Sequence, residues 1–291
     1  MSAQGKSIWT VVDIIRWGTE YFGAKGVDSP RLTIELLITD VLKCTRLQLY
    51  LMHDRPLTEK ELSILRETCS RRAKREPLQY ILGKAHFYGL EFDISPAVLI
   101  PRPETETLID TVLKYCASIP DPLHIIDIGT GSGCIAITLA HHLQHRTNMV
   151  IQAVDVSTEA LDIAKKNAQT HKVNIIFEHA DLFQREHPLQ GIVVSNPPYI
   201  SIGEYAQLEP ELTYEPKVAL TDNADGLAFY KKISDLIGYS DSSVHAFFLE
   251  LGYGQMEDVE NFFAPLSQSL NKVHDLSGIE RVLWGEVNTA L

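Results

Sequence analysis

The sequence predicts an α/β protein in which a doubly wound sheet of seven strands follows a small helical N-terminal domain. Apolar residues recur at three- and four-residue spacings within the first 80 residues, which is typical of amphipathic helices. Beyond residue 120, short apolar stretches alternate with helical ones, and a glycine-rich turn follows the first of them. We therefore expect a helical domain over residues 1–80, a hairpin linker over 81–102 and the sheet domain over 103–291.

Length and composition agree with this division. A chain of 291 residues holds about two domains at ~150 residues each. Hydrophobic residues make up 45% and charged residues 22%, the balance of a soluble globular protein. No apolar run approaches the ~20 residues that span a bilayer, and Asp13 and Arg16 interrupt the N-terminal region before a signal-peptide core develops. We expect a cytoplasmic protein without membrane contact.

The charge is divided unevenly along the chain. The net charge is −12, yet residues 1–80 carry 13 basic and 10 acidic side chains while residues 81–291 carry 13 and 28. This asymmetry indicates two parts with different partners.

The four cysteines lack paired spacing, and His141, His142 and His145 end one predicted helix. We therefore expect reduced, packed cysteines, a solvated histidine face and no metal site.

Two apolar stripes predict the first helices. The expected buried positions are Ile8, Val11, Val12, Ile15, Leu32, Leu36, Leu37 and Val41. Ser29-Pro30 and Thr58 are residue types that begin helices. The helix predicted over 59–75 carries a run of basic residues: Arg66, Arg71, Arg72, Lys74 and Arg75. We interpret this run as a solvated polar face, with a docking patch as the alternative.

Seven apolar stretches read as the strands of the sheet. They cover residues 123–128, 150–155, 175–178, 191–195, 245–251, 269–274 and 281–284. Mostly helical segments, among them 134–142, separate the first five, which predicts parallel strands. A further helix, 104–116, precedes the first strand. A tight turn at 276–278 joins the last two strands, which we expect to end the sheet as an antiparallel pair.

A candidate ligand site begins where the first strand ends. Its cofactor-binding candidates are Gly129, Thr130, Gly131, Ser132, Gly133 and Asp155. Glycines between a strand and a helix let a nucleotide approach the backbone, and a carboxylate ending the next strand can accept ribose hydroxyls. The turn lacks the GxGxxG spacing of dinucleotide folds and begins with Asp127, which suits cationic S-adenosylmethionine better than a pyrophosphate. Asp127 itself is either a turn cap or a direct ligand.

A second candidate site follows the fourth strand, at Asn196, Pro197, Pro198 and Tyr199. The two prolines stiffen the chain and remove two donors, so that carbonyl oxygens point outward. A planar NH2 group could donate to the Asn196 side-chain oxygen and to the Pro197 carbonyl, with Tyr199 against its flat face. We expect all four residues to bind substrate, with Asn196 polarising and Tyr199 positioning it. The alternative is a structural Pro-Pro turn with a buried tyrosine.

These two sites share the chain with other distinctive stretches. They lie at 79–83, 87–89, 98–106, 215–216, 225–227 and 250–255. Together they resemble the protein-(glutamine-N5) methyltransferases that modify class I peptide chain release factors, and the resemblance covers nearly the whole chain. Asn-Pro-Pro-Tyr alone occurs in many amino-methyltransferases, whereas its combination with the Ile-Pro-Arg-Pro-Glu-Thr-Glu stretch is much more specific.

The resemblance implies a Rossmann-like class I methyltransferase sheet and methyl transfer from S-adenosylmethionine to the glutamine amide of a release factor's Gly-Gly-Gln loop. It implies that Asn196 also contacts the cofactor, and that the helical domain grips the release factor. Leu182 stands where similar proteins can carry an aromatic residue along the adenine, so we expect apolar packing without stacking. Arg102 and Glu104 are expected near the methionine end of the cofactor, with a plain helix N-terminus as the alternative. The 275–281 segment departs from the family pattern and its role stays open.

Two other classes of function compete with this one. An adenine methyltransferase could use the same clamp on a flipped base, but the acidic charge of residues 81–291 disfavours nucleic acid. A non-catalytic adaptor would need no amine clamp. We therefore expect release factors as partners and no direct nucleic-acid substrate.

Overall fold

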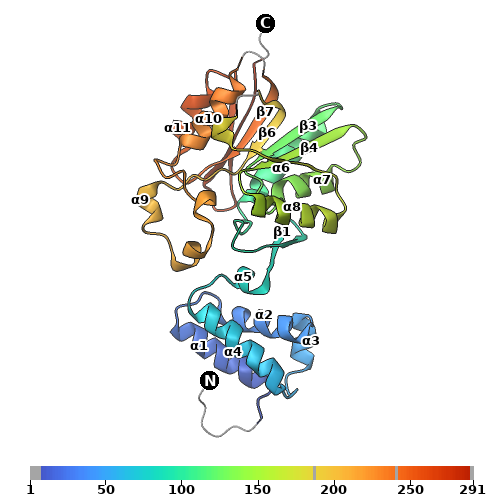
Figure 1. Cartoon of the computed structure of the whole chain (residues 1–291), viewed down its shortest axis with the longest axis vertical. Coiled ribbons are helices and arrows are strands. Elements are labelled where there is room, and N and C mark those ends of the chain that lie inside the picture. Colours follow the sequence, from blue (N-terminus) through green and yellow to red (C-terminus); the bar gives the residue numbers. More distant parts are fainter. Residues whose placement is uncertain (1–7, 186–187, 240–241, 289–291) are drawn as a thin grey trace. The chain divides into compact units, whose positions relative to one another are not determined.

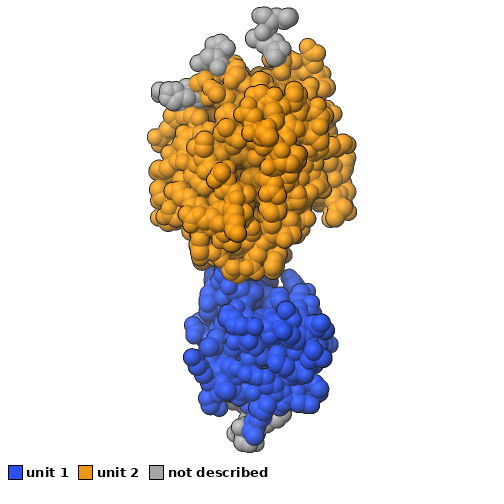
Figure 2. All heavy atoms as spheres, turned by 90° about the vertical axis from the view of Figure 1, so that its right-hand side faces the viewer, with its two compact units in different colours: residues 1–83, 210–214 blue, residues 84–209, 215–291 orange. Residues whose placement is uncertain are grey.

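The computed structural model describes residues 8–185, 188–239 and 242–288. The chain divides into two compact units, which Figure 2 colours separately. Unit 1 comprises residues 1–83 with 210–214, and unit 2 comprises 84–209 with 215–291. Residues 1–7 lie outside the described residues. The expectation that the chain has no signal peptide rests partly on them.

Unit 1 consists of helices joined by short loops in its described part. Its elements are α1 (Val11–Ala24), α2 (Pro30–Leu42), α3 (Arg46–Leu51), α4 (Glu59–Ala73), α5 (Leu78–Leu82) and the later 3-10 turn η2 (Pro210–Tyr214). Ser29 precedes α2 with Pro30 at its first turn. Thr58 caps α4 by accepting the backbone N–H of Glu61. Both helix starts are therefore confirmed, and both follow from residue type.

The buried faces of α1 and α2 differ in part from the predicted stripes. The largest fully buried side chains on these helices are Phe22, Ile14, Ile34, Leu37 and Ile38. Ile8 precedes α1 and is 59% exposed, and Leu32 is 40% exposed, so these two predictions are wrong. Both helices carry apolar residues on more than one face, so the apolar spacing alone does not determine which face is buried. Close contact of Ile34 with Gly18, which has no side chain, favours the observed face.

The basic end of α4 is only partly solvated. Arg72 is 6% exposed and donates to the Glu211 carboxylate at 3.1 and 3.2 Å. Arg75 Nε also lies 2.6 Å from that carboxylate. The expected solvated face is therefore wrong at Arg72. Its partner Glu211 belongs to η2, 139 residues further along the chain, which no local pattern reveals.

Unit 2 begins with a hairpin and continues as a seven-stranded sheet. The hairpin strands are β1 (Lys84–Phe87) and β2 (Leu90–Asp93). The sheet strands are β3 (Leu123–Ile128), β4 (Met149–Asp155), β5 (Ile176–His179), β6 (Gln190–Ser195), β7 (Ser243–Glu250), β8 (Leu270–His274) and β9 (Glu280–Glu286). Their order is β5-β4-β3-β6-β7-β9-β8, parallel from β5 to β7. Strand β9 is antiparallel to both β7 and β8, which confirms the predicted antiparallel finish.

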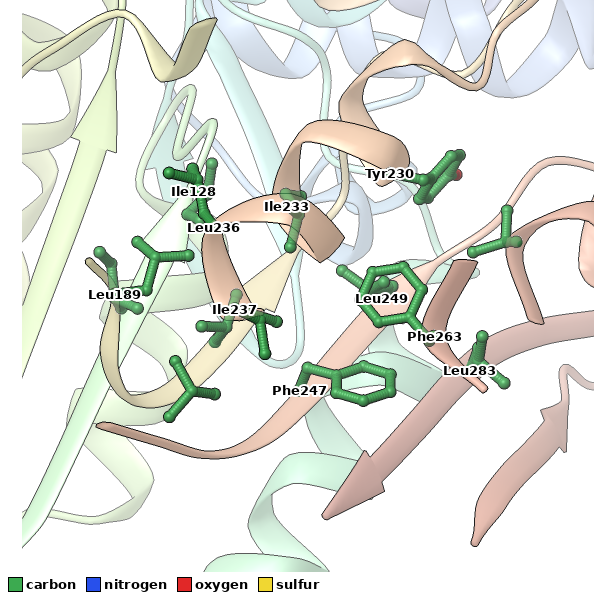
Figure 3. Close-up of a cluster of buried hydrophobic side chains, with 14 of the residues drawn as sticks. Ile128, Leu189, Tyr230, Ile233, Leu236, Ile237, Phe247, Leu249, Phe263 and Leu283 are labelled. Carbon is green, nitrogen blue, oxygen red and sulfur yellow. The ribbon is translucent and has the colours of Figure 1, made fainter. Parts of the chain in front are cut away.

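Helices line the sheet of unit 2. They are α6 (Thr105–Ser118), α7 (Cys134–His142), α8 (Thr158–His171), α9 (Ile202–Tyr205), α10 (Ala228–Ile237) and α11 (Met256–Phe263), with 3-10 turns η1 (Leu182–Gln184) and η3 (Lys217–Ala219). Helix α7 packs between α6 and α8, and α10 packs against α11 (Figure 1). In Figure 3, Ile233 and Ile237 of α10 lie in one buried cluster with Phe247 and Leu249 of β7.

The order of the strands locates the ligand crevice. The chain runs outward from β3 to β4 and β5, and then returns to the other side of β3 with β6 and β7. In sheets of this topology, ligands bind at the carboxyl ends of the strands beside that reversal. The ends of β3, β4 and β6 are therefore the expected site.

Candidate active site

A cavity of about 320 Å³ opens where β3, β4 and β6 end. Gly129 and Gly131 line it after β3, Asp155 ends β4 beside it, and the 195–198 stretch lines it after β6. Further lining residues come from the 97–99 and 181–183 segments, from parts of the 216–223 segment and from Phe229. Every wall belongs to unit 2.

The glycine loop leaves its backbone open to this cavity. Gly129 and Gly131 have φ of +75° and +55°, and a Cβ at either would meet no atom within 4 Å. One oxygen of the Asp155 carboxylate accepts the Gly131 N–H at 2.8 Å, and the other accepts the Ser157 N–H at 2.9 Å. Each oxygen keeps a lone pair that can accept a ligand hydroxyl. Burial raises the pKa of Asp155 above its usual value.

Asp127 caps the same loop from its buried side. It is fully buried, and its carboxylate accepts the Thr130 hydroxyl at 2.6 Å and the Ala136 N–H at 3.2 Å. Burial raises the pKa of Asp127 to about 7. Of the two roles left open by the sequence, these contacts support the cap.

Asn196 is oriented by helix α6. Its Nδ2 donates to the Oγ1 atom of Thr105 at 3.1 Å, and Thr105 is 2% exposed at the start of α6. Because the nitrogen end of the planar amide is engaged, the oxygen end is the acceptor that remains for a ligand. The preceding Ser195 donates its hydroxyl to the Ile128 carbonyl at 2.8 Å, which ties this segment to β3.

Tyr199 is held through its backbone. Its carbonyl accepts the Gln255 side-chain N–H at 2.9 Å, and Gln255 in turn accepts the Gly252 N–H at 3.0 Å. The Tyr199 ring lies so close to Gly252 that a Cβ there would be 2.9 Å from it. Burial raises the pKa of Tyr199 to about 12, so the phenol stays protonated and does not act as a base near neutral pH.

The cavity brings together most of the residues predicted from the sequence. Those on its lining are Gly129, Gly131, Asp155, Leu182, Asn196, Pro197 and Pro198. Thr130, Ser132, Gly133 and Tyr199 are not on it. Thr130 and Ser132 are 3% and 2% exposed, which places them beneath the loop rather than on its surface.

Two aromatic residues that the sequence did not single out complete the apolar end of the cavity. Leu182 is buried there, and the next residue, Phe183, also lines the cavity with 47% exposure. Phe183 meets Phe229 edge to face, with ring centroids 4.8 Å apart. An aromatic surface is therefore present one residue beyond Leu182.

Arg102 forms an ion pair away from the cavity lining. Its guanidinium donates to Glu215 at 2.6 Å, and the other Glu215 oxygen accepts the Ile100 N–H at 3.1 Å. The Ile-Pro-Arg-Pro stretch and the Glu-Pro pair at 215–216 are thus joined. Glu104 is the N-cap residue of α6, which fits the helix-terminus alternative.

The 275–281 segment has a structural role. The Asp275 side chain accepts the Ser277 and Ile279 N–H groups at 2.9 and 3.0 Å, which closes the β8–β9 turn. Arg281 pairs with Asp275 at 3.2 Å and donates to the Leu251 carbonyl at 2.8 Å. The turn therefore supports the end of β7, where the 250–255 stretch begins.

The described residues contain no cluster of three or more His, Cys, Asp or Glu side chains that could hold a metal ion. In the part of the chain that the structure covers, no helix is both long and apolar enough to cross a membrane.

Comparison with known proteins identifies the class and then the family. The methyltransferase small domain family matches residues 105–222, and the PrmC N-terminal domain family matches residues 13–83. The hMettl16 catalytic domain, solved in complex with a MAT2A 3'UTR hairpin, shares the fold with a TM-score of 0.57 at 17% identity, over 77% of this chain and 84% of that one. The chain thus contains a methyltransferase small domain and shares the fold of a methyltransferase catalytic domain.

Relatives of similar length define the family more narrowly. A release factor glutamine methyltransferase of Geobacter sulfurreducens is 38% identical over 96% of this chain and 98% of its own. One from Chlorobaculum tepidum is 43% identical over 79% of this chain and 81% of its own. The chain belongs to the release factor glutamine methyltransferase family.

Proposed function

We propose that this protein transfers a methyl group from S-adenosylmethionine to the glutamine amide nitrogen in the Gly-Gly-Gln motif of class I peptide chain release factors. The observation that carries the proposal is the orientation of Asn196, which lines the cavity with its amide nitrogen bound to Thr105. Its oxygen and the Pro197 carbonyl together suit the two N–H groups of a primary amide. The relatives are named release factor glutamine methyltransferases, which supports a glutamine of a release factor as the substrate.

The residues around the cavity fit S-adenosylmethionine. Open backbone at Gly129 and Gly131 admits the ligand, and Asp155 has acceptor capacity for the two ribose hydroxyls. Leu182 and Phe183 offer an apolar and an aromatic surface to the adenine. When bound, the cofactor supplies an activated methyl group on a sulfonium.

The two acceptors of the clamp, the Asn196 side-chain oxygen and the Pro197 backbone carbonyl, favour the reaction by orientation and charge. An amide nitrogen is a weak nucleophile because its lone pair is delocalised, so alignment with the methyl group matters more than a strong base. Orientation of this kind is worth ~7 to 11 kcal/mol in favourable systems. Acceptance of both N–H groups by Asn196 and Pro197 also places partial negative charge where positive charge develops on nitrogen. After transfer, the surplus proton on the amide nitrogen passes to water.

We assign the helical unit 1 to binding the release factor, and we propose that the reaction takes place in the cytoplasm. The net positive charge of residues 1–80 sets it apart from the acidic remainder of the chain.

Partition of methyl label between substrates tests the proposed class of substrate. The protein is incubated with labelled S-adenosylmethionine, unmodified release factor and DNA, with the release factor and the DNA in equimolar amounts. The DNA contains both duplex and single strands. We expect label in the release factor alone, whereas label in DNA would transfer the function to nucleobase methylation.

A glycine beside the clamp gives a further prediction. Gly226 has φ +84°, and a Cβ there would lie 2.3 Å from the Tyr199 carbonyl oxygen and 2.9 Å from Gln255 Nε2. Gly226→Ala should therefore displace the Tyr199 backbone and lower kcat/KM for the release factor about 10- to 100-fold, since such strain costs on the order of 1–3 kcal/mol. Steady-state kinetics with the release factor as the varied substrate measures this loss of kcat/KM. Gly203→Ala is the matched control, because a Cβ at Gly203 meets nothing within 4 Å; equal activity of the two variants would contradict the prediction.

A further inference from the structure

A buried carboxylate lies next to the clamp and takes no part in the mechanism above. Glu250 ends β7, is 0% exposed, and neither of its side-chain oxygens has a hydrogen-bond partner within the usual limits. A buried acid without such partners is costly. Its retention at this position calls for a role beyond packing.

The surroundings of Glu250 connect it to Asn196. Burial raises the pKa of Glu250 to about 7, and the Thr105 hydroxyl is the group that opposes this rise most strongly. The same Thr105 oxygen accepts the Asn196 Nδ2–H. Thr105 begins α6, Glu250 ends β7, and these two elements pack against each other. Thr105 is therefore the group that links the buried acid to the clamp residue.

We propose that ionised Glu250 is a positioning residue that fixes the Thr105 hydroxyl and, through it, the orientation and polarity of the Asn196 amide. A carboxylate can only accept, so Thr105 turns its O–H toward Glu250 and offers its lone pairs to Asn196. A protonated Glu250 can donate to Thr105 instead and compete with Asn196. A chain of aligned hydrogen bonds also strengthens each member, which increases the negative charge on the Asn196 oxygen.

Several other ionisable groups act on Glu250 and bear on its titration. They are Arg281 of β9, Arg102 and Glu104 before α6, Tyr199 after β6, Tyr230 of α10 and Cys134 of α7. Arg281 and Arg102 favour the carboxylate, and Glu104 disfavours it. The two tyrosines and Cys134 have pKa values raised by burial, so they remain neutral between pH 6 and 8.

The inference rests on the proposed function, and the test separates the two. The full-length protein, Glu250→Gln, Thr105→Val and Thr105→Ser are assayed from pH 6 to 8 with release factor and S-adenosylmethionine, and cofactor affinity is measured by calorimetry. We expect kcat of the unaltered protein to rise through about pH 7. Glu250→Gln and Thr105→Val should lose about 10- to 100-fold in kcat, the range for one charge-assisted hydrogen bond. Cofactor affinity should stay within about threefold, because neither side chain lines the cavity.

Conservative variants and unfolding measurements complete the test. Thr105→Ser keeps the hydroxyl and should retain activity. Thr111→Val on the same helix is the control, because among the described residues the Thr111 hydroxyl bonds only to the Thr107 carbonyl. Because the pKa of Glu250 is raised in the folded state, its ionisation lowers stability as pH rises toward and through about 7. Glu250→Gln should therefore raise Tm at pH 8 more than at pH 5.

The outcomes are distinct. If the unaltered protein leaves the glutamine unmethylated, the proposed function fails. If it methylates the glutamine but Glu250→Gln keeps its kcat and pH profile, or Thr105→Val matches Thr105→Ser, the role of Glu250 is overturned. If Glu250→Gln does not fold, the pH profiles of the Thr105 variants decide: Thr105→Ser should keep the rise of kcat through about pH 7 and Thr105→Val should lose it, and an unchanged rise in Thr105→Val overturns the role of Glu250.

Discussion

Replacement of Asn196 by alanine should lower kcat about 10²- to 10³-fold, the effect of removing one preorganised group from a developing charge. We propose the Asn196 oxygen as the polarising acceptor of the clamp, and the bond from Asn196 Nδ2 to Thr105 at 3.1 Å orients the amide. Cofactor affinity should fall far less, because Asp155 and the glycine loop remain in place. The variant therefore separates the chemical step from binding.

Single-turnover kinetics and calorimetry with S-adenosylmethionine measure the two effects of Asn196→Ala. Asn271→Ala is the matched control, since Asn271 lies on β8 and is not on the cavity lining. Near-normal turnover of Asn196→Ala would contradict the clamp, and so would a loss of cofactor affinity that accounts for the whole effect.

Replacement of Asp155 by alanine should act on the opposite side of the cavity and weaken cofactor binding about 100-fold or more. The bonds that hold the Gly131 N–H at 2.8 Å and the Ser157 N–H at 2.9 Å disappear, together with the proposed acceptor for ribose hydroxyls. Loss of a charged hydrogen-bond partner costs ~1.5 to 3 kcal/mol, and the glycine loop also loses its support.

Calorimetric titration with S-adenosylmethionine measures the effect of Asp155→Ala. Asp162→Ala on α8 is the control, because the Asp162 side chain is 78% exposed and pairs only with Lys165 in the described structure. We expect the Asp162 variant to bind normally. An Asp155 variant with affinity within threefold of the unaltered protein would show that the ribose is bound elsewhere.

The elements that local patterns determine could be predicted from the sequence. All seven strands lie within two residues of their predicted ends, because each is a short apolar run bounded by turns or helices. The Asp155 position follows from the strand that precedes it. The Asn-Pro-Pro-Tyr segment is stiff by composition, so its acceptor character could also be inferred.

Contacts between distant segments could not be predicted in this way. Thr105 and Asn196 are 91 residues apart, and Arg72 and Glu211 are 139 apart. No periodicity in a single sequence reports such pairs. The role of Glu250 is hidden for the same reason, since it depends on Thr105 from another element. Ile8 was misplaced because apolar spacing predicts a helix more reliably than it predicts which face is buried.

The central claim is that two acceptors at Asn196 and Pro197 select and orient a primary amide. Tandem mass spectrometry of a release factor after exhaustive reaction tests it most directly. The account predicts one methyl group, located on the glutamine of the Gly-Gly-Gln peptide, because a monomethylated amide no longer has two N–H groups to donate. Two methyl groups on that glutamine, or a methyl group on a different residue, would contradict it.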